Sequence, residues 1–152
     1  MPYFPPINEL SVALANDFTT ASTSLVDTPL TFVIQPNEVW AVTITGTVKK
    51  NSGTTGLRLG INAPSGCTIK GFQTGGQAAL STAMQNALIT AINTGLAIIA
   101  TGNNVEVPFV HQFVVTNSTN QGNITLQVLA VTSQNAVVFA GTKMNAFRTK
   151  TL

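Results

Sequence analysis

The strongest constraint on the fold is an alternation of apolar and polar side chains, with a period of two residues, along much of the chain. In residues 40–48 one set of alternating residues is Trp40, Val42, Ile44, Gly46 and Val48, and the other is Ala41, Thr43, Thr45 and Thr47. Residues 105–115 alternate in the same way. Because successive side chains of a β-strand point to opposite faces of a sheet, each stretch predicts a strand with one buried face.

Short clusters of Gly, Pro, Asn and Ser separate these stretches at intervals of about ten residues. Further strands are expected at residues 22–27, 30–35, 57–61, 69–72, 124–130, 136–141 and 143–149, with turns at 28–29 and 36–37 among others. Residues 75–96 are ambiguous, and we expect a loop or a single helical turn followed by a strand. The whole pattern predicts an all-β fold, an antiparallel, jelly-roll-like β-sandwich of about eight or nine strands.

The N-terminal residues, MPYFPPINEL, are rich in proline and unsuited to a helix. They predict an extended arm over residues 1–10, followed by a single β-sandwich domain over residues 11–152. The arm residues expected to make contacts are Pro2, Tyr3, Phe4, Pro5, Pro6 and Ile7. Two alternatives remain for the surface that they cover: the domain's own core, or a neighbouring subunit or capsid.

Charge is scarce, and this limits the chemistry that the chain can perform. Charged residues make up 8% of the 152 residues, with one His and one Cys besides, whereas a typical domain has about a quarter. Hydrolysis, phosphoryl transfer and redox chemistry depend on ionisable groups or metal ligands. The composition therefore argues against an enzyme, and we expect no cofactor and no metal.

The same scarcity bears on partners. No cluster of Lys or Arg exceeds the Lys49-Lys50 pair, so we do not expect nucleic-acid binding. The longest apolar-leaning stretch, residues 87–100, is too short to cross a bilayer, so no membrane partner is expected. Because charge keeps small domains soluble and apart, a chain this poor in charge favours an obligate oligomer or a particle-bound subunit.

His111 lies between Phe109 and Phe113 on the apolar side of its predicted strand. With no second His and no neighbouring Cys or acid, a His/Cys metal site is excluded. We expect a buried or interface histidine that is bonded to a backbone group. In this Phe-lined setting it could also act as a pH-sensitive contact, and the three residues are the candidate seam of an oligomer.

Two further groups of residues support other functions. Candidate ligand residues, for a host glycan for example, are Thr54, Thr55, Gln73 and Thr74, in two Gly-bearing loops. The acids Asp17, Asp27, Glu38 and Glu106 are scattered along the sequence. A sugar-active enzyme would need two of them to converge in space, and this is the least favoured alternative. Trp40 could stack on a sugar, but its place at the head of an apolar strand face favours core packing.

Two segments resemble a known family. Residues 22–64, STSLVDTPLTFVIQPNEVWAVTITGTVKKNSGTTGLRLGINAP, contain a polar Ser/Thr run, a leucine-led strand, a PNEVW turn into a long strand, and a GLRLGINAP strand and turn. Residues 110–147 add a Thr/Asn/Gly turn that leads into an ITLQV strand. These patterns resemble the opening and closing strands of small β-sandwich domains in tailed-bacteriophage virion proteins.

The resemblance implies a trimer of jelly-roll-like subunits on a phage particle, located at the capsid surface after synthesis in the host cytoplasm. The first function that it implies is a capsid decoration (cement) protein, a structural virion protein that binds the major capsid protein and stabilises the phage head. The alternative is the receptor-binding head domain of a tail or head fibre. No long shaft or coiled coil precedes the domain, which favours the first. The resemblance implies no catalytic residue.

Overall fold

The computed structural model describes residues 8–50, 56–75, 85–96, 99 and 104–151, and within them the chain is an all-β sandwich. The strands are β1 (Glu9–Ala13), β2 (Phe18–Thr20), β3 (Val26–Ile34), β4 (Glu38–Lys50), β5 (Leu57–Asn62), β6 (Thr68–Gly75), β7 (Gln85–Ile89), β8 (Val107–Thr116), β9 (Gly122–Ala130), β10 (Ala136–Val138) and β11 (Lys143–Thr151). The predicted fold class is confirmed, with eleven strands among the described residues where about eight or nine were expected. None of the described residues forms a helix that could cross a membrane.

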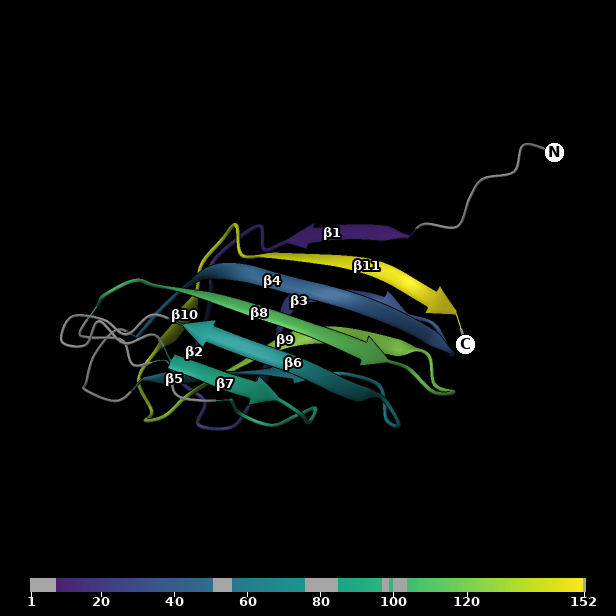
Figure 1. The fold of residues 1–152 in the computed structure, drawn as a ribbon. Coiled ribbons are helices and arrows are strands. Elements are labelled where there is room, and N and C mark those ends of the chain that lie inside the picture. The colour runs from purple at the N-terminus through teal and green to yellow at the C-terminus, as the bar shows by residue number, and fades with distance from the viewer. Residues whose placement is uncertain (1–7, 51–55, 76–84, 97–98, 100–103, 152) are drawn as a thin grey trace.

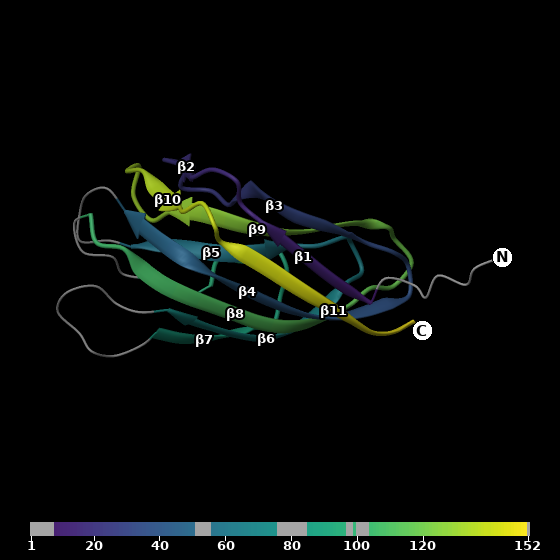
Figure 2. The same ribbon diagram turned by 90° about the horizontal axis from the view of Figure 1, so that it is seen from above.

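The strands form two antiparallel sheets that face each other (Figures 1 and 2). Sheet A has eight strands, in the order β1-β11-β4-β8-β6-β7, with β10 and β2 attached beside one end of β4. Sheet B has three strands, in the order β3-β9-β5. Because β1 and β11 are antiparallel neighbours, β1 begins and β11 ends at the same end of the sandwich (Figure 1).

The core lies between the two sheets and consists of the alternate side chains that the sequence marks as apolar. Sheet A supplies Trp40, Val42, Ile44, Val48, Phe109, Phe113 and Val115 among others, and sheet B supplies Leu30, Phe32, Ile34, Leu59, Ile61, Ile124, Leu126 and Val128. Across the interior, the rings of Trp40 and Phe32 lie 5.4 Å apart. The core role predicted for Trp40 is confirmed.

A polar clamp closes the core at the end where β1 begins. Arg148 on β11 pairs with Glu38 on β4, with Nη1 and Oε1 2.7 Å apart, and it also donates two hydrogen bonds to Asn8 Oδ1. Glu38 Oε2 accepts hydrogen bonds from Trp40 Nε1 and from the backbone N–H of Gln35, both at 2.9 Å. Burial alone would raise the pKa of the Glu38 carboxyl, but these hydrogen bonds and the Arg148 charge bring it below its usual value.

The predicted turn at Thr28-Pro29 is wrong, because one strand, β3, runs through it. Its register against β9 shifts between Asp27 and Thr31. The Thr28 hydroxyl replaces the missing ladder bonds: Oγ1 donates to Leu126 O at 2.9 Å and accepts from Leu30 N–H at 3.2 Å. Pro29 is tolerated because β3 lies at the edge of sheet B, where one side of the strand has no neighbour to bond.

Other differences concern short elements. The strand expected at residues 22–27 begins only at Val26, and the sequence pattern did not indicate β2, which has three residues. In the ambiguous stretch a strand does form, but at residues 85–89, and Asn93 follows in a left-handed conformation with φ of 52°. Of the expected arm, Glu9 and Leu10 belong to β1, and residues 1–7 lie outside the described residues.

Candidate functional site

The side chains that could perform chemistry serve structural roles instead of converging. Within the described ranges, no group of three or more His, Cys, Asp or Glu residues could hold a metal ion. Besides the clamped Glu38, the Asp27 carboxylate accepts hydrogen bonds from Asn62 and Gln127, and Asp17 Oδ1 accepts one from the backbone N–H of Ala140. Each of these three carboxylates is therefore held by its own hydrogen-bond partners.

His111 is a core residue, and its side chain has no exposed surface. Its Nε2 lies 2.9 Å from Oε1 of Gln73, so that Nε2 carries the proton and donates. Nδ1 is buried without a hydrogen-bond partner. Burial lowers the pKa of the imidazole to about 3, so the ring is neutral at physiological pH.

The predicted oligomer seam is therefore misplaced. Phe109, His111 and Phe113 are 2%, 0% and 4% exposed within a single chain, and all three pack between the two sheets. The prediction of a buried histidine holds, but its partner is the Gln73 side chain and not a backbone group. These residues have no surface left for a second subunit.

Of the four candidate ligand residues, the structure describes two. Gln73 and Thr74 lie in strand β6 and not in a loop; Gln73 is fully buried, and Thr74 Oγ1 donates a hydrogen bond to Asn86 Oδ1 at 2.9 Å. The sequence placed them in a loop because Gly71, Gly75 and Gly76 surround them. Thr54 and Thr55 lie outside the described residues, as do the six arm residues Pro2, Tyr3, Phe4, Pro5, Pro6 and Ile7.

The surface that stands out is the outer face of sheet A, meaning the side that points away from sheet B. In the part of the chain that the structure describes, six large apolar residues are well exposed, and four of them lie on this face: Phe72 at 43%, Leu88 at 76%, Val114 at 44% and Phe147 at 49%. They come from four different strands, β6, β7, β8 and β11. The outer face of a sandwich sheet normally carries polar side chains, so this apolar content requires an explanation.

The register of the sheet arranges these side chains in rows across the strands. The first row consists of Glu9, Phe147, Ala41, Val114 and Lys70, on β1, β11, β4, β8 and β6 in turn. The second row consists of Ser11, Asn145, Thr43, Gln112, Phe72 and Leu88, and it extends to β7. Within these two rows charge is confined to the ends of the first, and the row beyond the second carries Lys143 on β11.

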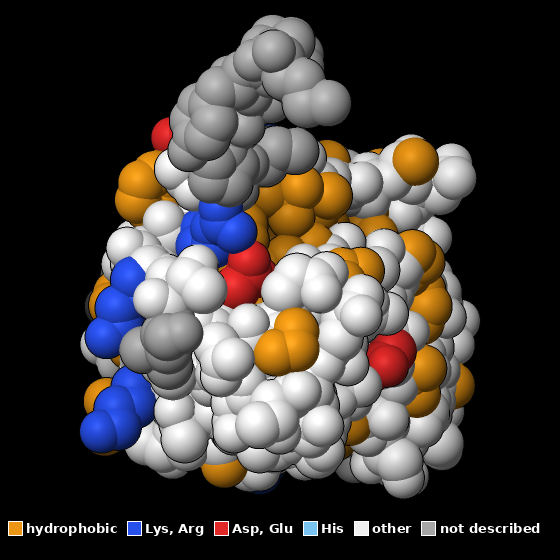
Figure 3. Space-filling view, turned by 90° about the vertical axis from the view of Figure 1, so that its right-hand side faces the viewer, with side chains coloured by type: hydrophobic (Ala, Val, Ile, Leu, Met, Phe, Trp, Pro, Cys, Tyr) orange, Lys and Arg blue, Asp and Glu red, His pale blue; other side chains and the backbone are white. Residues whose placement is uncertain are grey.

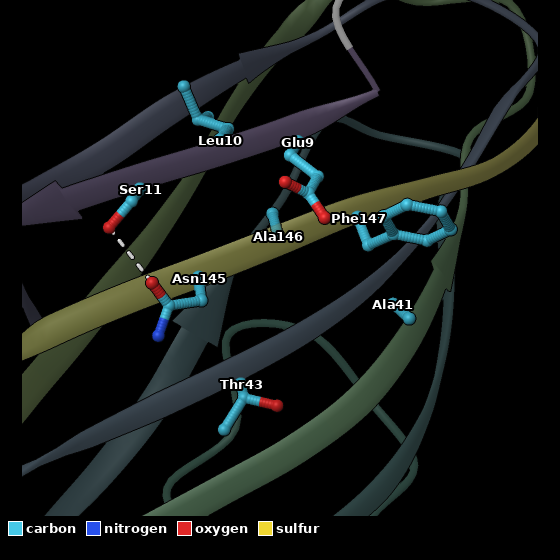
Figure 4. Close-up of a pocket in the computed structure, with 8 residues that line it drawn as sticks. All are labelled: Glu9, Leu10, Ser11, Ala41, Thr43, Asn145, Ala146 and Phe147. Carbon is cyan, nitrogen blue, oxygen red and sulfur yellow. Dashed lines mark hydrogen bonds between the residues drawn. The ribbon is translucent and has the colours of Figure 1, made fainter.

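Two shallow hollows lie side by side on this face and share Ala41 and Thr43. The first, of about 520 Å³, is bordered by β1, β11 and β4, and Figure 4 shows the Glu9 carboxylate and the Phe147 ring over it. The second, of about 360 Å³, is bordered by β4, β6 and β8. Gly71 borders the second hollow, and β6 approaches β8 so closely there that a Cβ on this residue would overlap the Gln112 carbonyl.

Charge is also sparse on a surface at right angles to this face. The end view in Figure 3 shows a few charged side chains among uncharged polar and apolar ones.

Of the basic pair Lys49-Lys50, Lys50 is buried and bonded to Thr132, whereas Lys49 lies over the Phe139 ring with Nζ 5.4 Å from its centre. The pair therefore forms no basic patch.

The sequence contained a signal for the outer face that the prediction did not use. On β8 the residues opposite in phase to the core include Val110 and Val114, so both faces of this strand carry apolar side chains. On two other strands of sheet A, β6 and β11, Phe72 and Phe147 are likewise out of phase with the core. Only the register of the sheet shows that they belong to one surface.

Comparison with known proteins identifies no family. No family model matches the chain, and no curated protein matches it. Among solved structures, an Eiger TNF from S. frugiperda is similar at 7% identity and a TM-score of 0.42, with 95% of each chain covered. The tripod of the baseplate of bacteriophage Tuc2009 is similar at 9% identity and a TM-score of 0.35, with 97% of this chain and 70% of that chain covered.

A third solved structure is that of infectious bursal disease virus, Gt strain, at 13% identity and a TM-score of 0.25. The match covers 94% of this chain and 38% of that chain. The likenesses thus include a phage baseplate component and a virus particle, at scores that carry no conclusion about function.

Proposed function

We propose that this protein is a structural component of a phage particle that acts through a contact surface and not through catalysis. The observation that carries the proposal is the outer face of sheet A, where the exposed apolar side chains Phe72, Leu88, Val114 and Phe147 lie among mainly uncharged polar ones. Glu38 is held in the clamp, Asp27 is bonded to Gln127, and His111 is buried in the core beside Gln73. The sequence resemblance of residues 22–64 and 110–147 to virion β-sandwich domains supports the particle as the location.

Within that class, the role we propose is a trimeric capsid decoration protein that binds the major capsid protein. Each subunit would add a modest contact, and a trimer would join three of them at one site on the lattice. Linked contacts of this kind raise the overall affinity far above that of one contact. The capsid would then be held against the internal pressure of its DNA without any chemical step.

The test is the copy number of this protein per purified particle, measured by quantitative mass spectrometry against the major capsid protein. A copy number comparable with that of the capsid protein is expected. A few copies per particle would overturn the decoration role and favour a tail, neck or fibre location. Absence from the particle would overturn the structural virion role altogether.

A second experiment addresses the stabilising role directly. Particles that lack the protein should release their DNA at a lower temperature than complete particles, and purified protein added back should restore the difference. Equal release temperatures would contradict a cement function. The fibre-head alternative receives no support from the described residues, since Gln73 is buried and Thr74 is bonded within the β6–β7 hairpin.

A further inference from the structure

We propose that the outer face of sheet A binds the same face of a second copy of this chain, about a rotation axis that runs parallel to the strands. This deepens the proposed structural role by naming the surface that joins the subunits. It replaces the misplaced seam with the opposite face of the same strand, β8. Its test uses the purified protein alone, so its outcome is independent of the copy number on the particle.

The distribution of charge on the face favours a second copy over a different partner. Glu9 and Lys70, both exposed, stand at opposite ends of the first row, four strands apart. At the usual strand spacing this is a separation of about 19 Å. Three uncharged side chains lie between them, so that the row is acidic at one end, neutral in the middle and basic at the other.

Such a row is complementary to itself in one orientation. A two-fold or three-fold axis parallel to the strands brings the β1 side of one face against the β6 side of the next. Glu9 of one copy then approaches Lys70 of the other. An axis in the same plane but perpendicular to the strands would place Glu9 against Glu9 and Lys70 against Lys70, and like charges in contact are unfavourable. The charges therefore select the axis along the strands.

The shape of the face agrees with this orientation. The same rotation brings the Phe147 side of the first row toward the Val114 side of the second copy, and it brings the two hollows together. Each hollow has a projecting ring at its border, Phe147 for the first and Phe72 for the second. Aromatic side chains that fill hollows on a partner are the usual anchors of protein interfaces.

The size of the face is sufficient for a stable contact. Five neighbouring strands of five to thirteen residues present on the order of 700 Å² on one side, and each partner in a standard interface buries ~800 Å². The interior of the two rows is uncharged, so burying it incurs no desolvation of ions. Glu9 and Lys70 lie at the rim, where charges determine orientation more than affinity.

The first test is the oligomeric state of the purified full chain by sedimentation velocity across a range of concentrations. We expect a closed oligomer, and a dimer or a trimer both satisfy the axis. Val114→Glu should convert it to a monomer. The matched control is Val33→Glu, since Val33 is 50% exposed but lies on β3 in sheet B, and this variant should remain assembled.

Circular dichroism and thermal melting of both variants at low concentration establish that each still folds. A wild-type chain that stays monomeric at the highest concentration would overturn the proposal. So would an oligomer that withstands Val114→Glu or that dissociates equally with Val33→Glu, because assembly would then use another surface.

Charge reversal tests the orientation. Glu9→Lys and Lys70→Glu should each weaken self-association about tenfold, the equivalent of about 1.4 kcal/mol. The double variant, which exchanges the two charges, should recover most of the wild-type affinity. If the effects of the two single changes simply add, Glu9 does not meet Lys70 and the axis along the strands is wrong.

Discussion

The two faces of strand β8 differ in what they contact, although their residues alternate one by one. On the inner face, Phe109, His111 and Phe113 are enclosed by the two sheets of one chain. On the outer face, Val114 is 44% exposed and has apolar neighbours on other strands that are equally open. The inner face is buried within one chain, whereas the outer face would be buried only by the second copy proposed above. Apolar character alone therefore does not distinguish a core from an interface.

The comparison predicts that the same truncation has different costs on the two faces. Phe109→Ala, in the core, should lower the free energy of unfolding by about 4 kcal/mol, because it removes a buried ring and leaves a cavity. Phe72→Ala, on the outer face, should cost less than about 1 kcal/mol in the monomer, since Phe72 is 43% exposed. Chemical denaturation at low protein concentration measures both. Equal costs would contradict the division between the faces.

Arg148 and Phe147 extend the comparison to consecutive residues of β11. Arg148→Ala should destabilise the fold by about 3 kcal/mol, because it leaves the Glu38 carboxylate without its counter-charge in a largely buried position. Lys143→Ala on the same strand is the control and should have little effect, since the Lys143 side chain is exposed. If both variants unfold at the same denaturant concentration, the clamp contributes nothing.

The buried histidine predicts a pH dependence that belongs to the inner face. With a pKa of about 3 in the fold and an ordinary value of 6.5, His111 binds a proton in the unfolded chain before it does so in the folded one. Stability is therefore greatest above pH 6.5 and falls as the pH decreases toward 3. Between pH 8 and pH 5 the loss should be about 2 kcal/mol.

His111→Leu should remove this slope, and urea denaturation at several pH values measures it. Glu38 causes a separate loss of stability at lower pH. Its pKa is lowered in the fold, so its stabilising effect disappears only as the carboxyl becomes protonated, below its ordinary value of 4.5. The window between pH 6.5 and 5 therefore isolates the histidine. A slope that persists in His111→Leu over this window would assign it to another group.

Much of the fold could be predicted from the sequence, because alternation and turn residues are local signals. They predicted the core strands β4, β5, β8, β9 and β11 and the turn at Pro36-Asn37, where Asn37 adopts a positive φ of 63°. The break expected at Thr28-Pro29 failed because a proline is compatible with an edge strand, and the sequence does not say which strands lie at an edge.

The candidate site was less predictable, for a related reason. The alternation on β8 correctly placed His111 and its neighbours on the apolar face, but it did not reveal that sheet B would cover them. The outer face depends on the register, which brings Glu9 and Lys70 to the ends of one row although they are far apart in sequence. Gln73 was misplaced because its glycine neighbours are as compatible with a close approach of two strands as with a loop.

The last prediction compares the two faces most directly, because it makes the same substitution at the adjacent positions Val114 and Val115. The change at Val114 has the smallest expected effect of all. Val115→Thr places a hydroxyl where the side chain is fully buried, and it should cost about 1–3 kcal/mol unless the hydroxyl finds a hydrogen-bond partner. Val114→Thr has the same change in shape and suits a strand equally well, so the monomer should change by less than about 0.5 kcal/mol. Denaturation at low concentration measures both variants.

Raising the concentration then separates an open surface from an interface. If the outer face becomes buried between copies, Val114→Thr should become as costly as Val115→Thr once the wild-type chain assembles, because its hydroxyl would lose water in the same way. If its cost stays near zero at concentrations where the wild type is oligomeric, Val114 remains exposed in the assembly and the subunits meet elsewhere. The position that appears neutral in the monomer is therefore the one that reports on the interface.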